Sequence, residues 1–123
     1  MAGDRRVRLG QTGEDLAVEA LRARGYAILD RRYRTRSGEI DIVARDGSTI
    51  VFVEVKTRES GRFGSPLEAI TGWKRRKLSG LAIEYLSRRR LTDCPCRFDV
   101  VAVYEAEGRQ TIEVVQGAFD GRW

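Results

Sequence analysis

The chain has 123 residues, of which 41% are hydrophobic and 33% charged, a composition that suits one folded domain over residues 1–123 with one hydrophobic core. Its formal net charge of +5 favours a polyanionic partner, and nucleic acid is the first expectation. The chain contains no histidine, which excludes Ser-His-Asp triads, Cys-His dyads and zinc sites built on imidazole. Any catalysis must therefore use carboxylates, lysine or a metal ion held by oxygen atoms.

The N-terminal segment and the two cysteines indicate the expected compartment. Residues 1–10 are charged and no apolar run follows them, so we expect neither a signal peptide nor a membrane anchor. Cys94 and Cys96 are separated only by Pro95, a spacing too short for an easy disulfide, and are interpreted as ordinary thiols. We therefore expect a cytoplasmic protein that does not contact membranes.

The first elements are a helix, a short strand and a basic segment. Apolar residues recur at helical spacing after Thr12 and Asp15, which predicts a helix over residues 13–24 that ends at Gly25. Residues 26–29 are apolar and suit a short strand. The segment DRRYRTRS follows, with four arginines around one tyrosine, and is expected to be a basic loop or the end of that strand.

A β-hairpin follows and is the clearest pattern in the sequence. Residues 38–44 and 49–57 both alternate at the strand period, and Asp46-Gly47 between them is a strong hairpin signal. With these two residues at the centre of the turn, Glu39 lies opposite Glu54.

The same register places acidic and basic side chains on one face of the hairpin. Asp41 lies opposite Phe52 and becomes a diagonal neighbour of Glu54, and Lys56 joins that face two residues further on. A turn with an odd number of residues would instead put Asp41 and Glu54 on opposite faces. The expected cluster therefore depends on the register.

Converging carboxylates repel one another, so a partly buried cluster requires a positive charge or a retained proton. Mg²⁺ or Mn²⁺, bound through oxygen ligands, would satisfy this requirement and suit phosphodiester hydrolysis, with Lys56 orienting the attacking water. The alternative is that these side chains line a solvated face and make ordinary ion pairs. The apolar residues nearer the turn on the same face argue against that alternative.

A second helix is expected after a flexible loop. Ser65 as N-cap, Pro66 in the first turn and Glu68 three residues after the cap predict its start. The helical pattern runs towards Arg88, and a break near Gly72 is left open.

The remaining pattern predicts strands over residues 97–104 and 111–115, joined by a turn at Gly108. The order is then helix, three strands, helix, two strands. This order predicts an α/β fold in which helices flank a mixed central sheet.

Asp41, followed by Glu54-Val55-Lys56 on the next strand, resembles the motif of the PD-(D/E)XK nuclease superfamily. The segments GEIDIVARDG, VFVEVKTR and RFDVVAV, with Gly13-Glu14, extend this likeness over nearly the whole chain to the YraN-like family of small proteins. The resemblance implies a single restriction-endonuclease-like domain, similar to Holliday-junction resolvases, with metal-dependent nuclease activity.

The resemblance also implies roles for individual residues. Glu14, Asp41 and Glu54 match the acidic metal ligands, the backbone carbonyl of Val55 would complete the set, and Lys56 matches the catalytic lysine of the motif. Glu14 also lies on the apolar face of its helix, where a charged residue is unexpected unless it reaches a polar site. Pairing with the helix dipole explains Glu14 equally well.

Three further positions lie outside the set of acidic ligands and the motif lysine. Lys74 lies one turn before Leu78 on the inward face of the second helix, so it either reaches the scissile phosphate or extends along the core edge. Glu39 would support the metal ligands from behind. Arg32 stands where the family leads us to expect an asparagine, and it could strengthen a phosphate contact.

We expect the partner to be DNA, including branched or flapped DNA, although RNA fits the composition equally well, and related resolvases suggest a homodimer. The alternative is a catalytically silent nucleic-acid-binding or assembly protein that retains the nuclease fold. Basic segments are often plain solvated surface, but several on one small domain favour binding. The residues expected to hold the nucleic-acid backbone or stack on a base are Arg31, Arg32, Tyr33, Arg34, Arg36, Arg58 and Lys74.

Overall fold

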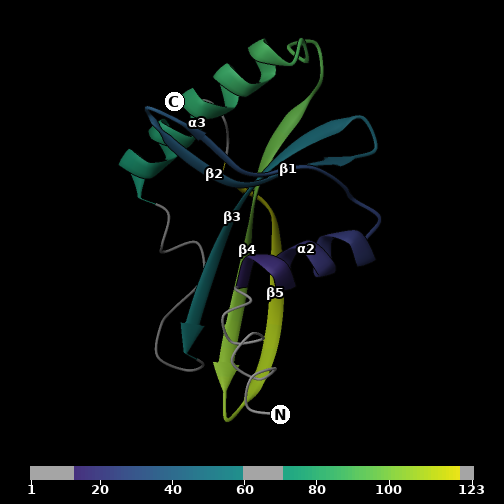
Figure 1. The fold of residues 1–123 in the computed structure, drawn as a ribbon, viewed down its shortest axis with the longest axis vertical. Helices are drawn as coiled ribbons and strands as arrows, with labels where there is room; N and C mark the ends of the chain where they lie inside the picture. Colours follow the sequence, from purple (N-terminus) through teal and green to yellow (C-terminus); the bar gives the residue numbers. More distant parts are fainter. Residues whose placement is uncertain (1–12, 60–70, 120–123) are drawn as a thin grey trace.

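The computed structural model describes residues 13–59 and 71–119, drawn in colour in Figure 1. Neither helix within these ranges is long and apolar enough to cross a bilayer. The order of helices and strands is the order expected from the sequence. The elements are α2 (Gly13–Ala23), β1 (Ala27–Thr35), β2 (Gly38–Asp46), β3 (Thr49–Glu59), α3 (Gly72–Arg88), β4 (Cys96–Ala106) and β5 (Arg109–Phe119).

The five strands form one mixed sheet in the order β1-β2-β3-β4-β5. β3 and β4 are parallel and are connected across α3, whereas the other neighbours are antiparallel. A parallel pair requires a long crossover, which the helix provides. This is the expected α/β arrangement of a single, restriction-endonuclease-like domain.

Each face of the sheet carries its own helix and its own hydrophobic cluster. Phe52 and Phe98 pack with Tyr85 of α3 on one face, whereas Val51 and Val53 pack with Leu21 of α2 on the other. Successive residues of β3 therefore serve opposite clusters, as the pleat of a strand requires. Because both faces are covered, the middle of β3 is a continuous apolar run that ends at Glu54.

Several strands are longer than predicted, and α3 begins at the break near Gly72 that the sequence pattern leaves open. β1 extends to Thr35, so most of the basic segment forms the end of this edge strand, which was one of the two expected alternatives. α3 begins at Gly72, where Thr71 is the N-cap and its hydroxyl accepts a hydrogen bond from Lys74 N–H at 3.1 Å. The helix-start signals at residues 65–68 lie outside the described residues. Both cysteines are free thiols, as expected.

The hairpin turn is displaced by one residue from its expected position. Asp46 pairs with Thr49, which leaves Gly47 and Ser48 as the turn residues, with Gly47 at φ +62°. Asp46 remains in the strand because its carboxylate is held by Arg97 Nη2 at 3.0 Å. Each residue of β2 therefore pairs with a residue two positions further along β3 than predicted. Because this shift is even, the side chains keep the faces predicted for them, although their direct partners change.

Candidate functional site

β2 and β3 separate at Asp41. Their pairing ends at Ile42 with Val53, which makes Asp41 and Glu54 the next residues on the two strands. Beyond that point the Asp41 carboxylate accepts a hydrogen bond from Val55 N–H at 2.8 Å. Figure 1 shows β1 and β2 turning away while β3, β4 and β5 continue together. Asp41 and Glu54 are therefore direct neighbours at this separation, closer than the diagonal arrangement expected from the sequence.

The twist of β2 explains where the Asp41 side chain lies. Ile40 packs in the cluster beneath α3, whereas Ile42 packs in the cluster beneath α2. In a regular strand these two residues would face the same side. The change of face occurs at Asp41, so its carboxylate lies at the junction between the two cores and is only half-buried.

Glu54 receives two lysines. It is only 6% exposed and lies on the α3 face of the sheet, two residues after Phe52. Lys56 Nζ lies 3.1 Å from Glu54 Oε2, and Lys74 Nζ from the first turn of α3 contacts the same oxygen. Lys74 thus points inward, as its spacing predicted, and contacts a carboxylate.

The charged groups of this cluster differ in how far their surroundings stabilise the charged form. Burial, followed by repulsion from Glu54, raises the pKa of Asp41 to about 7. Burial, followed by the neighbouring ammonium of Lys74, lowers the pKa of Lys56. Burial acts to lower the pKa of Lys74, but its hydrogen bonds to Glu54 and Lys56, together with attraction to Glu54 and Asp41, outweigh burial and raise the pKa. The cluster therefore neutralises Glu54 better than it neutralises Asp41.

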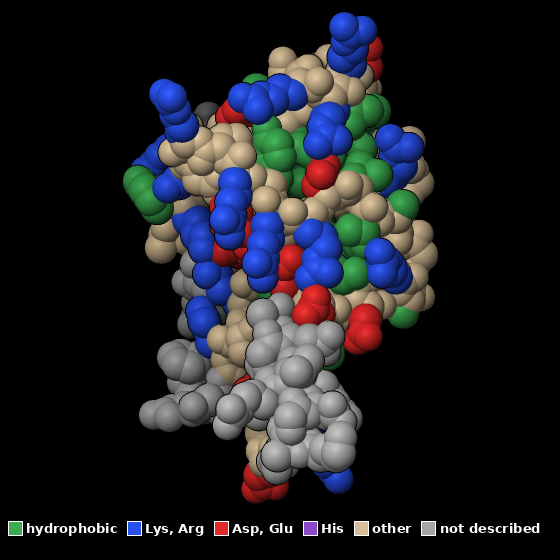
Figure 2. Space-filling model, in the orientation of Figure 1, with side chains coloured by type: hydrophobic (Ala, Val, Ile, Leu, Met, Phe, Trp, Pro, Cys, Tyr) green, Lys and Arg blue, Asp and Glu red, His purple; other side chains and the backbone are tan. Residues whose placement is uncertain are grey.

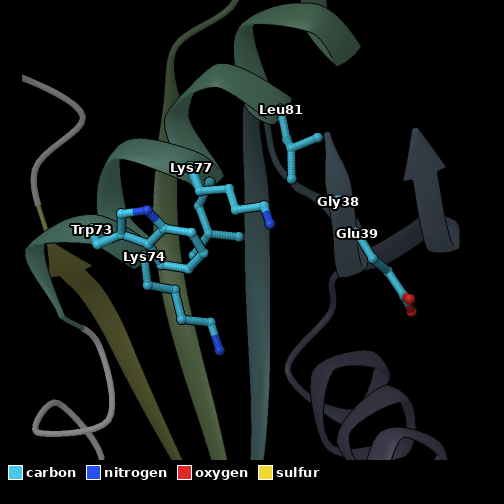
Figure 3. A pocket seen from close by; sticks show the side chains of 7 residues that line it. Gly38, Glu39, Trp73, Lys74, Lys77 and Leu81 are labelled. Carbon is cyan, nitrogen blue, oxygen red and sulfur yellow. The ribbon is translucent and has the colours of Figure 1, made fainter. Parts of the chain in front are cut away.

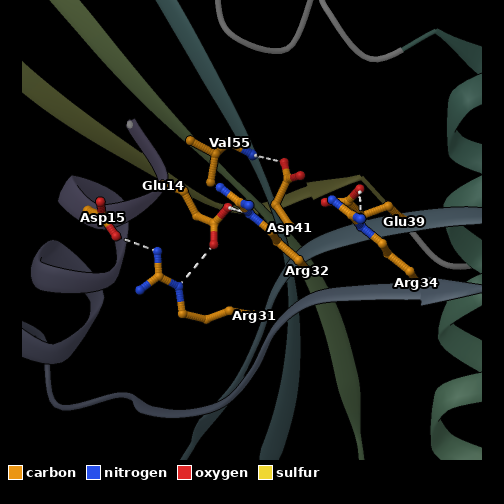
Figure 4. A network of polar contacts seen from close by, with 8 residues as sticks. All are labelled: Glu14, Asp15, Arg31, Arg32, Arg34, Glu39, Asp41 and Val55. Atoms are coloured by element: carbon orange, nitrogen blue, oxygen red, sulfur yellow. Dashed lines mark hydrogen bonds and ion pairs between the residues drawn. The ribbon is translucent and has the colours of Figure 1, made fainter. Parts of the chain in front are cut away.

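Glu14 lies near the cluster but is engaged by arginines. The start of α2 packs closely on the sheet, because a side chain at Gly13 would collide with the Thr57 hydroxyl. Glu14 Oε1 then pairs with Arg31 Nε and its Oε2 with Arg32 Nε, both at 2.9 Å (Figure 4). The Glu14 side chain is only 11% exposed, so it is a partly buried ion pair.

Arg32 reaches Glu14 because its backbone is unusual. Neighbouring strand residues normally point to opposite faces, yet Arg31 and Arg32 contact the same carboxylate. Arg32 has φ +53°, the left-handed region that asparagine adopts more readily than arginine. This conformation gives a physical reason for the asparagine that the family resemblance led us to expect here.

Other predicted binding residues are placed differently. Tyr33, expected to stack on a base, is partly buried and packs edge-on against Tyr85 at the margin of the core, with ring centroids 5.0 Å apart. Glu39, expected opposite Glu54, pairs instead with Arg34 Nε at 3.2 Å, because Arg34 is its direct partner across β1 and β2. Lys and Arg side chains form a band across the middle of the face in Figure 2.

Of the two predicted binding residues that remain, Arg36 is exposed beyond the end of β1. Arg58 is partly buried near the end of β3, and its Nη1 donates to the carbonyl of Thr57 at 3.2 Å. The basic residues therefore remain candidates for backbone contacts at different distances from the Asp41–Glu54 pair.

The carboxylates partly fit a divalent cation. Asp41 and Glu54 present oxygen ligands from two adjoining strands, and burial together with repulsion from Glu54 raises the pKa of Asp41. Within the described ranges, however, no group of three or more acidic, cysteine or histidine side chains is placed to hold a metal ion. The structure thus brings Asp41 and Glu54 together, whereas the Glu14 carboxylate is engaged by Arg31 and Arg32.

Comparison with known proteins connects this geometry to a family. The sequence profile of Uncharacterised protein family UPF0102 matches residues 13–103. A UPF0102 protein of Moorella thermoacetica is 51% identical over 116 residues, covering 93% of this chain and 97% of the relative. One from Symbiobacterium thermophilum is 50% identical over 113 residues, covering 91% and 96%. A third, from Geobacter metallireducens, is 49% identical over 112 residues, covering 91% and 92%.

The chain belongs to the UPF0102 family. The YraN-like resemblance, and with it the PD-(D/E)XK nuclease-like superfamily, is thereby confirmed. The matched range in this UPF0102 protein includes Glu14, the Asp41–Glu54 pair and both lysines. It ends at Val103, within β4, so β5 lies outside it.

One feature beside the site was missed from the sequence. Trp73 follows the N-cap of α3 and is 63% exposed, next to Lys74. The available signal was its position, because Trp73 falls outside the apolar stripe formed by Leu78, Leu81 and Tyr85. A large apolar residue on the polar side of a helix is informative when a hollow adjoins it.

Proposed function

We propose that this UPF0102 protein is a metal-dependent endonuclease that hydrolyses phosphodiester bonds in DNA, including branched or junction DNA, with Mg²⁺ or Mn²⁺ as cofactor. The observation that carries the proposal is the Asp41–Glu54 pair at the separation of β2 and β3, with Lys56 3.1 Å from Glu54. Acidic groups from two strands with a lysine beside them suit phosphodiester chemistry. A divalent cation between these two carboxylates would offset the repulsion that helps to raise the pKa of Asp41.

In this proposal Asp41, Glu54 and the backbone carbonyl of Val55 would hold the metal. When bound, the metal activates water and offsets charge on the phosphate. Lys56 has a lowered pKa and lies within the cluster, so it can orient the attacking water or stabilise the developing negative charge. Lys74 brings a second ammonium from α3, close to where a phosphate would lie.

The basic residues of β1 would contact the strand outside the cluster. Arg31 and Arg32 are 41% and 51% exposed, so they can exchange part of their pairing with Glu14 for phosphate oxygens. Such an exchange would release the Glu14 carboxylate next to the Asp41–Glu54 pair. A homodimer, which would suit a two-fold junction, remains a prediction.

A second candidate function is nucleic-acid binding or assembly without turnover. Two observations favour it: Glu14 is held by two arginines, and Glu54 is already neutralised by two lysines. A cation would have to displace or share these partners. RNA is an equally suitable ligand for this candidate, since the arginines would contact the backbone.

Assays on linear, flapped and four-way DNA with and without Mg²⁺ or Mn²⁺ test the proposal. We expect metal-dependent cleavage that Asp41→Asn, Glu54→Gln or Lys56→Ala each reduces at least about 100-fold, with DNA binding retained. Asp93→Asn changes an exposed aspartate in the loop before β4 and is the matched control. Binding without cleavage of any of these DNAs would favour the second candidate.

A further inference from the structure

Trp73 is exposed in the first turn of α3, close to the candidate active site. Its side chain belongs to neither hydrophobic cluster of the sheet, and 63% of the residue is exposed. Lys77, one turn further on, holds its Nζ 4.9 Å from the centroid of the indole ring. A single exposed aromatic side chain carries no argument by itself. The space beside it does.

A hollow of about 150 Å³ lies beside Trp73, between the start of α3 and the start of β2 (Figure 3). Leu78 and Leu81 give it an apolar lining on the helix side, and Gly38 lines it from β2. Gly38 has φ +143°, and a Cβ there would lie 2.8 Å from Lys77 Cε. The bare backbone at this position therefore helps to keep the hollow open.

The hollow has a basic rim and adjoins the candidate site. Lys74 and Lys77 both line it, and the acidic residue of the lining, Glu39, is paired with Arg34 at 3.2 Å. Lys74 also contacts Glu54, so one lysine belongs to both the hollow and the carboxylate cluster. A ligand in the hollow would therefore lie next to a group bound at the carboxylates.

These features together describe the chemistry of the occupant. A flat aromatic ring can stack on the indole above an apolar lining, and an anionic group attached to that ring would meet the two ammonium groups. The space suits one nucleobase but not a base pair. An aliphatic side chain of a protein partner would leave the lysines unused, and a free anion would leave Trp73 unused.

We infer that Trp73 and this hollow hold one unpaired base of a DNA strand, next to the phosphodiester that the carboxylate cluster receives. The inference rests on the proposed function, because the nuclease proposal places the DNA strand at the carboxylate cluster beside the hollow. It narrows the substrate to DNA with an unpaired segment at the cleavage point, as in a flap or a single strand. Trp73 acts in this role as a binding residue.

Fluorescence titration without metal tests the stacking contact, because no cleavage then occurs. The chain has two tryptophans, so Trp123→Phe leaves Trp73 as the reporter. We expect an oligothymidylate of eight nucleotides to quench Trp73 emission in that variant. Measured by anisotropy of labelled oligothymidylate, Trp73→Ala should weaken binding about 5- to 100-fold, while Trp73→Phe retains most of the affinity.

Ile83→Ala is the matched control, because Ile83 is 66% exposed on the same helix. We expect it to leave the affinity unchanged. Equal affinities of Trp73→Ala and Ile83→Ala, or no quenching of Trp73 at saturating oligothymidylate, would overturn the inference.

An abasic scan locates the stacked base. One abasic nucleotide is placed at successive positions of the oligothymidylate. At one position we expect the wild-type protein to lose affinity, whereas the affinity of Trp73→Ala, which already lacks the stacking contact, should not fall further. Equal losses for both proteins at every position would refute the hollow as a base site.

The same proteins separate this inference from the nuclease proposal. If flapped DNA is cleaved and Asp41→Asn abolishes cleavage while Trp73→Ala leaves both binding and cleavage intact, only the base site is wrong. If no DNA is cleaved but the Trp73-dependent binding is found, only the nuclease proposal fails.

Discussion

Two aspartates, Asp41 and Asp99, occupy similar places in the sheet and have opposite surroundings. Each accepts a backbone N–H where strand pairing is interrupted. Asp41 takes Val55 N–H at 2.8 Å beyond the end of the β2–β3 pairing, and Asp99 takes Gly117 N–H at 3.0 Å where the β4–β5 register shifts. An interrupted ladder therefore explains why an aspartate is accommodated in both places.

The partners of Asp99 compensate its charge. Arg97 donates to it through Nε at 3.0 Å and through Nη2 at 3.3 Å, and the Tyr26 hydroxyl donates at 3.3 Å. Gln116 donates in turn to the Tyr26 hydroxyl. Asp99 is fully buried, and its charge and hydrogen bonds are satisfied within the protein. This cluster joins β4, β5 and the segment after α2.

The surroundings of Asp41 compensate its charge less fully. Its nearest strand neighbour is Glu54, which has the same charge, and the ion pairs of Lys56 and Lys74 are made to Glu54. The pKa of Asp41 rises to about 7 as a result of burial and of this neighbour. Groups with strongly shifted pKa values are concentrated at functional sites. The comparison thus separates an aspartate that is satisfied within the fold from one whose charge is disfavoured there, which keeps Asp41 a candidate site residue.

Removing Asp99 should have the largest effect on stability. Asp99→Ala leaves the Arg97 charge partly buried without its main partner and leaves Gly117 N–H without an acceptor. Breaking a buried pair in this way costs about 3–5 kcal/mol. Urea unfolding followed by circular dichroism measures the free energy of unfolding. The exposed Asp93→Ala is the control, and a loss below about 1 kcal/mol at Asp99 would show that the cluster is not structural.

Asp41→Asn should act in the opposite direction and depend on pH. The pKa of Asp41 rises from 3.8 to about 7 on folding, so the folded state retains the proton longer than the unfolded state does. Wild-type stability therefore falls as the pH rises from about 4 to 7 and levels off above that. Asparagine keeps an acceptor for Val55 N–H and carries no charge, so the variant avoids this loss.

We expect Asp41→Asn to be more stable than wild type by about 1–3 kcal/mol at pH 8 and to match it near pH 4. Urea unfolding at both values of pH measures the difference in the absence of divalent cations. Asp93→Asn should show no such dependence. A variant that is less stable than wild type at pH 8 would mean that the charged carboxylate contributes to the fold, as Asp99 does.

The fold was predictable where the pattern is local. Residues 38–44 and 49–57 identified the hairpin, because two strand-like segments rich in buried apolar residues flank the turn signal Asp46-Gly47. The exact turn was not predictable, because Asp46 is retained in the strand by Arg97, which lies far along the sequence. The shared face of Asp41 and Glu54 survived this error because the register moved by an even number of residues.

The site was less predictable than the fold. Lys74 could be expected to point inward from its helical spacing, but its contact with Glu54 depends on how α3 crosses the sheet. The partners of Glu14 depend on the left-handed backbone of Arg32, which no propensity of arginine would suggest. Tyr33 looked available for stacking because the basic segment suggested exposure, whereas the change of face after Arg32 turns it towards the margin of the core.

The ion pairs of Glu14 should contribute less to stability than the Asp99 cluster does. Glu14→Gln removes the charge that Arg31 and Arg32 share, and both arginines are about half-exposed. Solvent screening keeps such pairs weak, so we expect a loss of about 1 kcal/mol in urea unfolding. Glu19→Gln, an exposed change on the same helix, is the control. A loss of about 3 kcal/mol or more would place Glu14 with Asp99 among the structural acids.

The smallest effect concerns the backbone that brings the arginines to Glu14. Arg32→Asn and Arg32→Ala both remove the ion pair with Glu14, so their difference isolates the preference of residue 32 for φ +53°. Asparagine tolerates the left-handed region better than alanine, because its short polar side chain bonds locally to the backbone. We expect Arg32→Asn to be the more stable of the two by about 0.5 kcal/mol in urea unfolding. Equal stabilities would mean that the strand relaxes once the arginine is lost, so that the left-handed turn is imposed by Glu14 and not by the sheet.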